Sequence, residues 1–229
     1  MANVRSLILS TDETYHVFNR SVERRPVFTS KREYQHMKDL IRFYRFAHLP
    51  MRYSQYSSLS VDVQKNVMDR LEQKGDMEVS LYAFSLMPNH FHFTLKQMKD
   101  NGVTTFLSNI SNSFAKYFNI RHKRTGSLWQ HPFKAVHIET DEQLLHVIRY
   151  THINPVVGLI IKEEELDTYP WTSLPEYLLE HSESICDTHF VKSQFHTINS
   201  LRSFTHDQVG YKHQFAKIEH LAIDVDTDE

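Results

Sequence analysis

The sequence contains little cysteine and little glycine, and each scarcity excludes a class of protein. Its single cysteine, Cys186, cannot form an internal disulfide, which is typical of a protein that works in a reducing compartment. Only five glycines occur, and none has the spacing of a P-loop or a dinucleotide-binding motif. The sequence also offers no cysteine-based zinc site, and no serine or cysteine lies in a recognisable nucleophile motif.

Long hydrophobic runs are missing as well. No apolar run approaches the roughly 20 residues that cross a membrane. The first ten residues lack the charged region and apolar core of a signal peptide. With 229 residues, of which 40% are hydrophobic and 24% charged, the chain is long enough for one domain with a smaller appendage. The sequence therefore predicts a cytoplasmic protein without a membrane partner.

Acidic residues are unevenly distributed along the chain. Residues 1–160 carry 21 Lys and Arg against 14 Asp and Glu, a net charge of +7, whereas residues 161–229 carry 5 against 14. This asymmetry predicts a basic functional domain at 1–178 and an acidic appendage at 179–229. Patterning in the appendage is weak: 208–222 is compatible with a helix, and we expect disorder at 224–229.

Alternation and periodicity predict an α+β fold. Two capping boxes, Ser30-Lys-Arg-Glu33 and Thr140-Asp-Glu-Gln143, each open a helix. Asn154-Pro155 ends the second of these helices, because a residue before proline is pushed out of the helical region. The order of elements favours a mainly antiparallel sheet with helices packed on it. The expected strands are 14–20, 77–86, 90–97 and 133–139, and the expected helices are 31–47, 61–73, 103–120, 141–154 and 172–180.

Two histidines lie on one face of the expected strand at 90–97. His90 and His92 are two residues apart, so their side chains point to the same side, while Phe91 and Phe93 point to the other and face the core. Two imidazoles held in this way can bind one divalent metal ion. The pair is common by chance, however, and surface or core histidines remain the alternative unless a third ligand and a nucleophile lie nearby.

Tyr150 and Asn154 supply such groups on one helix. They are four residues apart and therefore lie on one helix face, about one turn from each other. An amide oxygen is a hard ligand that suits Mg²⁺ or Mn²⁺. A phenol can act as a covalent nucleophile when a metal polarises its target. The alternative is a core tyrosine and an asparagine at a helix C-terminus.

Residues 101–138 contain no Asp or Glu and combine basic with aromatic side chains. Such a mixture suits a nucleic-acid strand, because the charges bind phosphates and the rings stack on exposed bases. The alternative is a solvated basic loop whose aromatic residues belong to the core. The residues expected to bind such a nucleic-acid strand are Lys116, Arg121, Lys123, Arg124, Trp129 and Lys134 here, with Arg20 and Arg24 in a second basic cluster.

Six segments spread in order over residues 13–178 resemble those of one family, the HUH-type single-tyrosine transposases, and within it the REP-associated tyrosine transposases. Singly these segments are weak, but six in order make the resemblance specific. They are Tyr15-His-Val-Phe-Asn-Arg20, Met87-Pro-Asn-His-Phe-His-Phe93, Phe114-Ala-Lys-Tyr-Phe-Asn119, Gly126-Ser-Leu-Trp-Gln130 with Phe133-Lys134, Arg149-Tyr-Thr-His-Ile-Asn-Pro155, and Tyr169-Pro-Trp-Thr-Ser173.

The resemblance implies a ferredoxin-like core with a central antiparallel sheet. It implies that His90, His92 and Asn154 bind Mg²⁺ or Mn²⁺, and that Tyr150 is the nucleophile. The implied reaction cleaves single-stranded, hairpin-forming DNA, leaves a 5′-phosphotyrosine link and a free 3′-hydroxyl, and reverses to join strands. A monomer and a homodimer are both compatible with it.

Two other functions remain open from the sequence. The first is a non-catalytic protein that keeps the fold to bind palindromic DNA hairpins. The second is a metal-dependent hydrolase of small phosphate esters. The pairing of Tyr150 with Asn154 favours strand transfer, since a binding module has no need for both residues.

Overall fold

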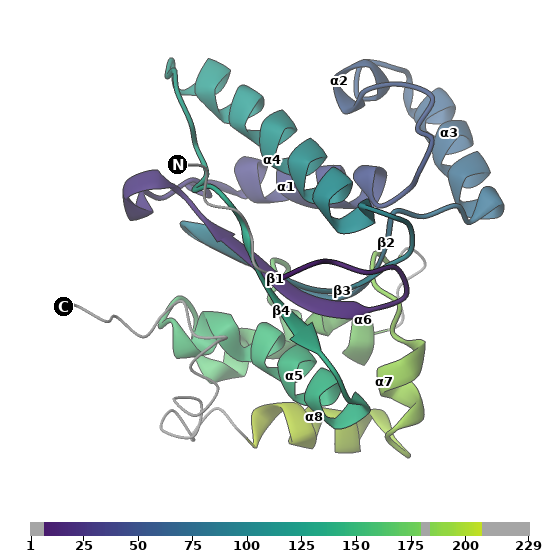
Figure 1. Ribbon diagram of the computed structural model, residues 1–229. Helices are drawn as coiled ribbons and strands as arrows, with labels where there is room; N and C mark the ends of the chain where they lie inside the picture. The colour runs from purple at the N-terminus through teal and green to yellow at the C-terminus, as the bar shows by residue number, and fades with distance from the viewer. Residues whose placement is uncertain (1–6, 180–183, 208–229) are drawn as a thin grey trace.

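The computed structural model describes residues 7–179 and 184–207, and the elements below lie within these ranges. A sheet of four strands lies between helices that cover both of its faces (Figure 1). The strands are β1 (Thr14–Arg20), β2 (Val79–Met87), β3 (His90–Gln97) and β4 (Lys134–Ile138). The helices are η1 (Val22–Arg24), α1 (Lys31–Tyr44), α2 (Tyr53–Tyr56), α3 (Val61–Lys74), α4 (Gly102–Arg121), α5 (Asp141–Val157), η2 (Glu163–Thr168), α6 (Leu174–Leu178), α7 (His189–Ser193) and α8 (Ile198–His206).

The four strands form one sheet in the order β2-β3-β1-β4, and each neighbouring pair is antiparallel. With helices α1 and α4 as the connections, this is the ferredoxin-like arrangement. The predicted α+β fold is therefore confirmed. The predicted strand at 90–97 matches β3 residue for residue, and the predicted strand at 14–20 matches β1.

The two faces of the sheet carry different side chains and are covered by different helices. Helices α1 and α4 lie on one face, and α5 lies on the other with α8 (Figure 1). On the α4 side, Phe93 packs against Phe106 with ring centroids 5.8 Å apart, and Phe91 packs against Trp129 at 5.1 Å. The predicted core side of β3 is therefore confirmed, and its histidines face α5.

Helix α5 crosses the histidine face of the sheet. Thr151 on this helix lies 3.1 Å from Thr94 of β3, between their hydroxyl oxygens, and so ties the helix to the strand. The prediction that Asn154-Pro155 ends this helix is wrong, because the helix continues to Val157 with Pro155 inside it. Pro155 lies in the last turn, where it removes only one helical hydrogen bond, and Gly158 then donates its backbone N–H to the Asn154 carbonyl at 2.8 Å.

The two predicted capping boxes form differently from the sequence pattern. Thr140 does cap α5, since its hydroxyl accepts from the Gln143 backbone N–H at 3.1 Å. Ser30 does not cap α1: its hydroxyl donates instead to the Glu33 carboxylate. The Glu33 carboxylate is buried and is bound by Arg121, the last residue of α4, at 3.1 Å and by the following His122 at 3.2 Å. A tertiary ion pair thus replaces the local cap.

The segment after α6 packs on α5. The guanidinium of Arg149 lies 4.2 Å from the Phe204 ring centroid of α8 and donates to the Phe204 carbonyl. The domain boundary at 178/179 stays a prediction, and the helix and the disorder expected after residue 207 lie outside the described residues. Within those residues, no helix combines the length and apolar character needed to cross a membrane.

Candidate active site

The histidine pair of β3 lies in the middle of the sheet, under α5. His90 and His92 have ring centroids 5.1 Å apart and are 4% and 0% exposed. On the neighbouring strand β1, Arg20 lies opposite His90 and Phe18 lies opposite His92. The alternation predicted from the sequence therefore holds both imidazoles on one buried face.

Tyr150 reaches this histidine face from α5. Its ring centroid lies 6.1 Å from that of His92 and 6.2 Å from that of His16 on β1. Its side chain is buried at 5% exposure, and Asn154, one turn further along the helix, is fully buried. The structure therefore brings Tyr150 next to His92 and to His16, with Asn154 one turn further along the same helix.

His16 is the residue that sequence reasoning missed. Its Nε2 lies 3.0 Å from Nδ1 of His92, within a hydrogen bond, so His92 is held by one ring nitrogen and keeps Nε2 for another partner. Burial lowers the pKa of His16 to about 3 and the pKa of His92 well below its ordinary value, so both rings are neutral. The signal was available in the alternation of β1, which places His16 on the same side as Phe18.

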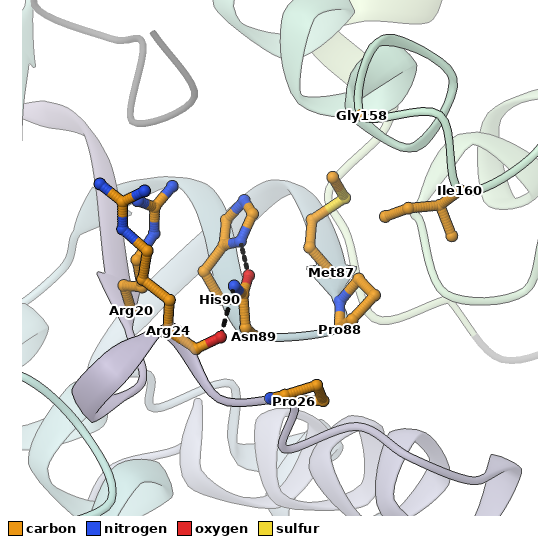
Figure 2. Close-up of a pocket in the computed structure, with 9 residues that line it drawn as sticks. All are labelled: Arg20, Arg24, Pro26, Met87, Pro88, Asn89, His90, Gly158 and Ile160. Carbon is orange, nitrogen blue, oxygen red and sulfur yellow. Dashed lines mark hydrogen bonds between the residues drawn. The ribbon is translucent and has the colours of Figure 1, made fainter. Parts of the chain in front are cut away.

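Asn89 engages Nδ1 of His90, as His16 engages Nδ1 of His92. Its Oδ1 accepts from Nδ1 of His90 at 2.6 Å, while its Nδ2 donates to the Arg24 carbonyl at 2.9 Å (Figure 2). Each histidine of the pair thus has Nδ1 engaged by a neighbour. Hydrogen bonds of this kind fix the tautomer and the ring orientation of histidines that bind metal through Nε2.

Buried polar atoms without partners test whether a metal ion fits this site. Within the described part of the chain, Nε2 of His92 and both amide atoms of Asn154 are buried and make no hydrogen bond. Such groups are costly unless something binds them. No group of three or more His, Cys, Asp and Glu able to hold a metal occurs in residues 7–179 and 184–207. A divalent ion at this site would therefore need the Asn154 oxygen as its third protein ligand.

A cavity of about 310 Å³ opens beside His90. Figure 2 shows Arg20 and Arg24 on one side of it, His90 and Asn89 at its floor, and Gly158 and Ile160 on the other side. Arg20 and Arg24, predicted to bind DNA, thus lie next to the histidine pair. The remaining lining residues are Pro26, Met87 and Pro88.

The other predicted DNA-binding residues divide into exposed lysines and arginines that pair within the protein. Lys116, Lys123 and Lys134 are exposed, and Lys134 lies 6.0 Å from the ring of Phe18, on the histidine side of the sheet. Arg121 and Arg124 are engaged within the protein, by Glu33 at 3.1 Å and by Asn119 at 2.7 Å.

Trp129 corrects the stacking prediction. It is 4% exposed and packs between Phe91, Phe28 and Phe114, with ring centroids 5.1 to 6.2 Å away. An indole enclosed in this way cannot stack on a DNA base in this conformation. The alternative left open from the sequence, that the aromatic residues of this segment belong to the core, holds for Trp129.

Comparisons with known proteins give a family match over part of the chain and a likeness in fold. Residues 51–154 match the family model described as "Transposase IS200 like". A solved structure of a REP-associated tyrosine transposase bound to a REP hairpin has the same fold, with a TM-score of 0.50, 15% identity, and coverage of 82% of this chain and 93% of that chain. A crystal structure of a Deinococcus radiodurans R1 protein assigned as a transposase gives a TM-score of 0.34 at 15% identity, covering 66% of this chain and 95% of that one. A search of curated proteins found no match.

Proposed function

We propose that this chain, a tyrosine transposase of the IS200-like family, cleaves and rejoins single-stranded DNA through a covalent bond to Tyr150. The family match supports the resemblance drawn from the sequence motifs. Three of the six segments lie within the matched residues 51–154, and a fourth, Arg149 to Pro155, lies there except for its last residue. The residues that carry out the reaction are our assignment from the geometry.

One observation supports the assignment above the others. Tyr150 lies on the same buried face as His92, with ring centroids 6.1 Å apart, and Asn154 follows one turn later on the same helix. A tyrosine placed in this way can attack a phosphate that lies between it and the histidine pair. A core tyrosine would have no need of unpartnered polar atoms around it.

Two imidazoles and one amide oxygen form a donor set that suits Mn²⁺ or Mg²⁺, and the imidazole nitrogens favour Mn²⁺ of the two. When bound there, the ion would supply Lewis-acid polarisation of the scissile phosphate. The protein's part is to hold Nε2 of His90 and His92 and the oxygen of Asn154 in place. His16 and Asn89 orient the two rings from behind.

The reaction at Tyr150 is a transesterification in two steps. The Tyr150 oxygen loses its proton and forms a bond to the phosphorus, while the bond from phosphorus to the 3′ oxygen breaks and that oxygen takes up a proton. The products are a 5′-phosphotyrosine link and a free 3′-hydroxyl. Attack by a 3′-hydroxyl on the link reverses the step, restores Tyr150 and joins two strands, so no further energy source is needed.

Hairpin DNA is the proposed substrate. A protein of the same fold has been solved with a REP hairpin bound. In this chain Arg20, Arg24 and Lys134 lie on the histidine side of the sheet, where a strand entering the site would meet them. Lys116 and Lys123 extend the exposed basic surface, and we assign to all five a contact with the DNA backbone.

A covalent-adduct assay tests this function. The protein is incubated with Mn²⁺ and a pool of 3′-labelled DNA hairpins with randomised single-stranded flanks, and adducts are separated on a denaturing gel. We expect an adduct with the wild type and none with Tyr150→Phe. Tyr117→Phe is the matched control, because the Tyr117 hydroxyl is buried without a partner and its loss should change nothing.

Two results would count against the proposal. An adduct that forms equally well with Tyr150→Phe would show that another residue is the nucleophile. Tight binding of hairpins without any adduct, in Mn²⁺ or Mg²⁺, would favour the non-catalytic DNA-binding alternative.

A further inference from the structure

We propose that the cavity beside His90 binds the single nucleotide on the 3′-hydroxyl side of the cleaved phosphate, so that a deoxynucleoside 5′-monophosphate is its smallest ligand. The proposal rests on the function proposed above. It goes further by assigning one side of the cleavage site to a defined pocket, with base selectivity as the consequence.

The cavity has two walls of different chemistry. Arg20 and Arg24 form the basic wall, and guanidinium groups bind phosphate through paired hydrogen bonds (Figure 2). Met87 and Ile160 form the apolar wall, against which the flat face of a base can pack. The volume of about 310 Å³ is at the lower end of the range for small-ligand pockets, so the cavity suits one nucleotide and not a folded strand.

Helix α5 sets the position of the cavity relative to the nucleophile. Tyr150, Asn154 and Gly158 follow each other at intervals of four residues, so they lie along one side of the helix end. At 1.5 Å per residue, Gly158 is roughly 12 Å beyond Tyr150 along the helix axis. The two histidines are arranged in the same order: His92 faces Tyr150, and His90 lines the cavity near Gly158.

The geometry of phosphoryl transfer then decides which nucleotide enters the cavity. The attacking and leaving oxygens lie roughly in line on opposite sides of the phosphorus. If the Tyr150 oxygen attacks from its end of the site, the leaving 3′ oxygen points away from Tyr150 and toward Gly158. The nucleotide that carries this 3′ oxygen therefore lies at the cavity, and after cleavage the cavity holds the 3′-hydroxyl ready for rejoining.

Gly158 offers a way to test the apolar wall without touching the basic one. A Cβ built on Gly158 would lie 2.7 Å from the terminal methyl of Met87, which is too close, and 3.2 Å from the Asn154 carbonyl oxygen, which needs a shift of only a few tenths of an ångström. Because that methyl is the end of a flexible side chain, Gly158→Ala should be tolerated by the fold and should displace Met87 from its place in the wall. Gly158 is exposed and its φ is −78°, a value that alanine adopts without strain.

The experiment titrates the full chain with each of the four deoxynucleoside 5′-monophosphates, and with 2-deoxyribose 5-phosphate as the ligand that lacks a base, by isothermal calorimetry. We expect at least one nucleotide to bind about fivefold more tightly than the sugar phosphate, because the base buries apolar surface against Met87 and Ile160. Gly158→Ala should remove that difference and leave sugar-phosphate binding unchanged.

Arg24→Gln tests the basic wall in the same titrations. We expect it to weaken all five ligands about tenfold, the usual effect of losing a hydrogen bond to a charged group. Arg70→Gln is the matched control, because Arg70 is exposed on α3, outside the residues that line the cavity, and it should change none of them. The proposal would be overturned if no nucleotide bound more tightly than 2-deoxyribose 5-phosphate, or if Gly158→Ala left the affinity for nucleotides unchanged.

The two proposals fail separately. Adduct formation at Tyr150 without selective nucleotide binding would overturn the pocket and leave the cleavage function standing. Selective nucleotide binding that depends on Gly158 and Arg24, without any adduct, would overturn the cleavage function and keep the pocket as a nucleotide site.

Discussion

His16 Nε2 lies 3.0 Å from His92 Nδ1, and this contact engages Nδ1 and leaves Nε2 of His92 as the nitrogen that faces other partners. For His92 to offer the Nε2 lone pair, its proton must be on Nδ1, and His16 Nε2 must accept it. His16 then carries its own proton on Nδ1. The contact is compatible with the tautomer of His92 that binds a cation through Nε2, and in that tautomer His16 is a positioning residue for the site.

Replacing His16 should therefore weaken metal binding without unfolding the protein. His16→Phe keeps the ring volume but removes the acceptor for His92, and we expect Mn²⁺ affinity to fall about 10- to 100-fold, the usual effect of losing such a partner. His16→Gln keeps an acceptor and should recover part of the loss. Calorimetric titration of Mn²⁺ in the absence of DNA measures this directly.

His48→Gln is the control for that titration, because His48 is exposed and pairs with Asp76 away from the site. It should bind Mn²⁺ as the wild type does. Equal affinity in His16→Phe and the wild type would contradict the role assigned to His16.

Replacing Asn154 with leucine should make the protein more stable and should weaken its binding of Mn²⁺. Its amide is fully buried, and neither of its two polar atoms has a partner among the described residues. Leucine has a similar volume and no polar atom to leave unsatisfied, so Asn154→Leu should raise the free energy of unfolding by about 1–2 kcal/mol. The same variant should lose the rise in stability that Mn²⁺ gives the wild type.

Urea denaturation with EDTA and with Mn²⁺ measures both effects on Asn154→Leu. A variant that is less stable in EDTA would show that the Asn154 amide is satisfied in the folded protein. A variant that Mn²⁺ still stabilises fully would remove Asn154 from the ligand set.

Substitution of Trp129 should lower the stability of the fold, whereas substitution of Lys134 should lower only the affinity for DNA. Trp129→Ala removes a buried indole from the cluster with Phe28, Phe91 and Phe114, and we expect it to cost about 3–5 kcal/mol of unfolding free energy. Lys134→Gln removes an exposed charge on β4 and should change stability by less than about 0.5 kcal/mol.

Lys134→Gln should lower the affinity for DNA hairpins although it leaves the stability of the fold unchanged. We expect Lys134→Gln to weaken binding to all hairpins alike and to reduce the slope of log K against log salt by about 1, because one phosphate contact is lost. Fluorescence anisotropy at several salt concentrations measures this slope. An unchanged slope would place Lys134 outside the DNA interface.

His206 should make the packing of α8 depend on pH. Burial opposes protonation of His206, but hydrogen bonds to Asp167 at 2.8 Å and to Glu163 at 3.0 Å outweigh it and raise its pKa. A raised pKa in the folded state means that the stabilisation is complete below the unfolded value of about 6.5 and is lost as the pH rises through the folded pKa. The contribution is partly screened by solvent and should stay below about 1 kcal/mol.

The difference in unfolding free energy between the wild type and His206→Gln measures this contribution. We expect the wild type to be the more stable at about pH 5.5 and the difference to shrink at about pH 8.5. A difference that grows with pH would contradict the assignment, since it would require a lowered pKa.

Local patterns in the sequence were enough to predict the strands and the histidine face. Strand alternation depends on the chain's own period of two, so β3 and the orientation of His90 and His92 could be deduced from residues 90–97 alone. Tyr150 and Asn154 could be paired because they are one helical turn apart. The side of the sheet that α5 covers, which joins the two sets, came from the resemblance.

Tertiary contacts explain what the sequence did not reveal. Ser30 and Glu33 have the spacing of a capping box, but Arg121, 88 positions away, binds the carboxylate and turns it into the core of an ion-pair cluster. His16 gains its role only when β1 pairs with β3, 76 positions away. Trp129 has the composition of a stacking residue, and only the packing of α4 against the sheet encloses it.

The most direct test of the central claim is to locate the DNA on the protein. Adducts formed with Mn²⁺ and labelled hairpins are digested with nuclease and trypsin, and the modified peptide is identified by mass spectrometry. The tryptic peptide of residues 150–162 contains one tyrosine, Tyr150. Our account predicts that the nucleotide mass is on this peptide, at Tyr150, and finding it on any other tyrosine would contradict the account.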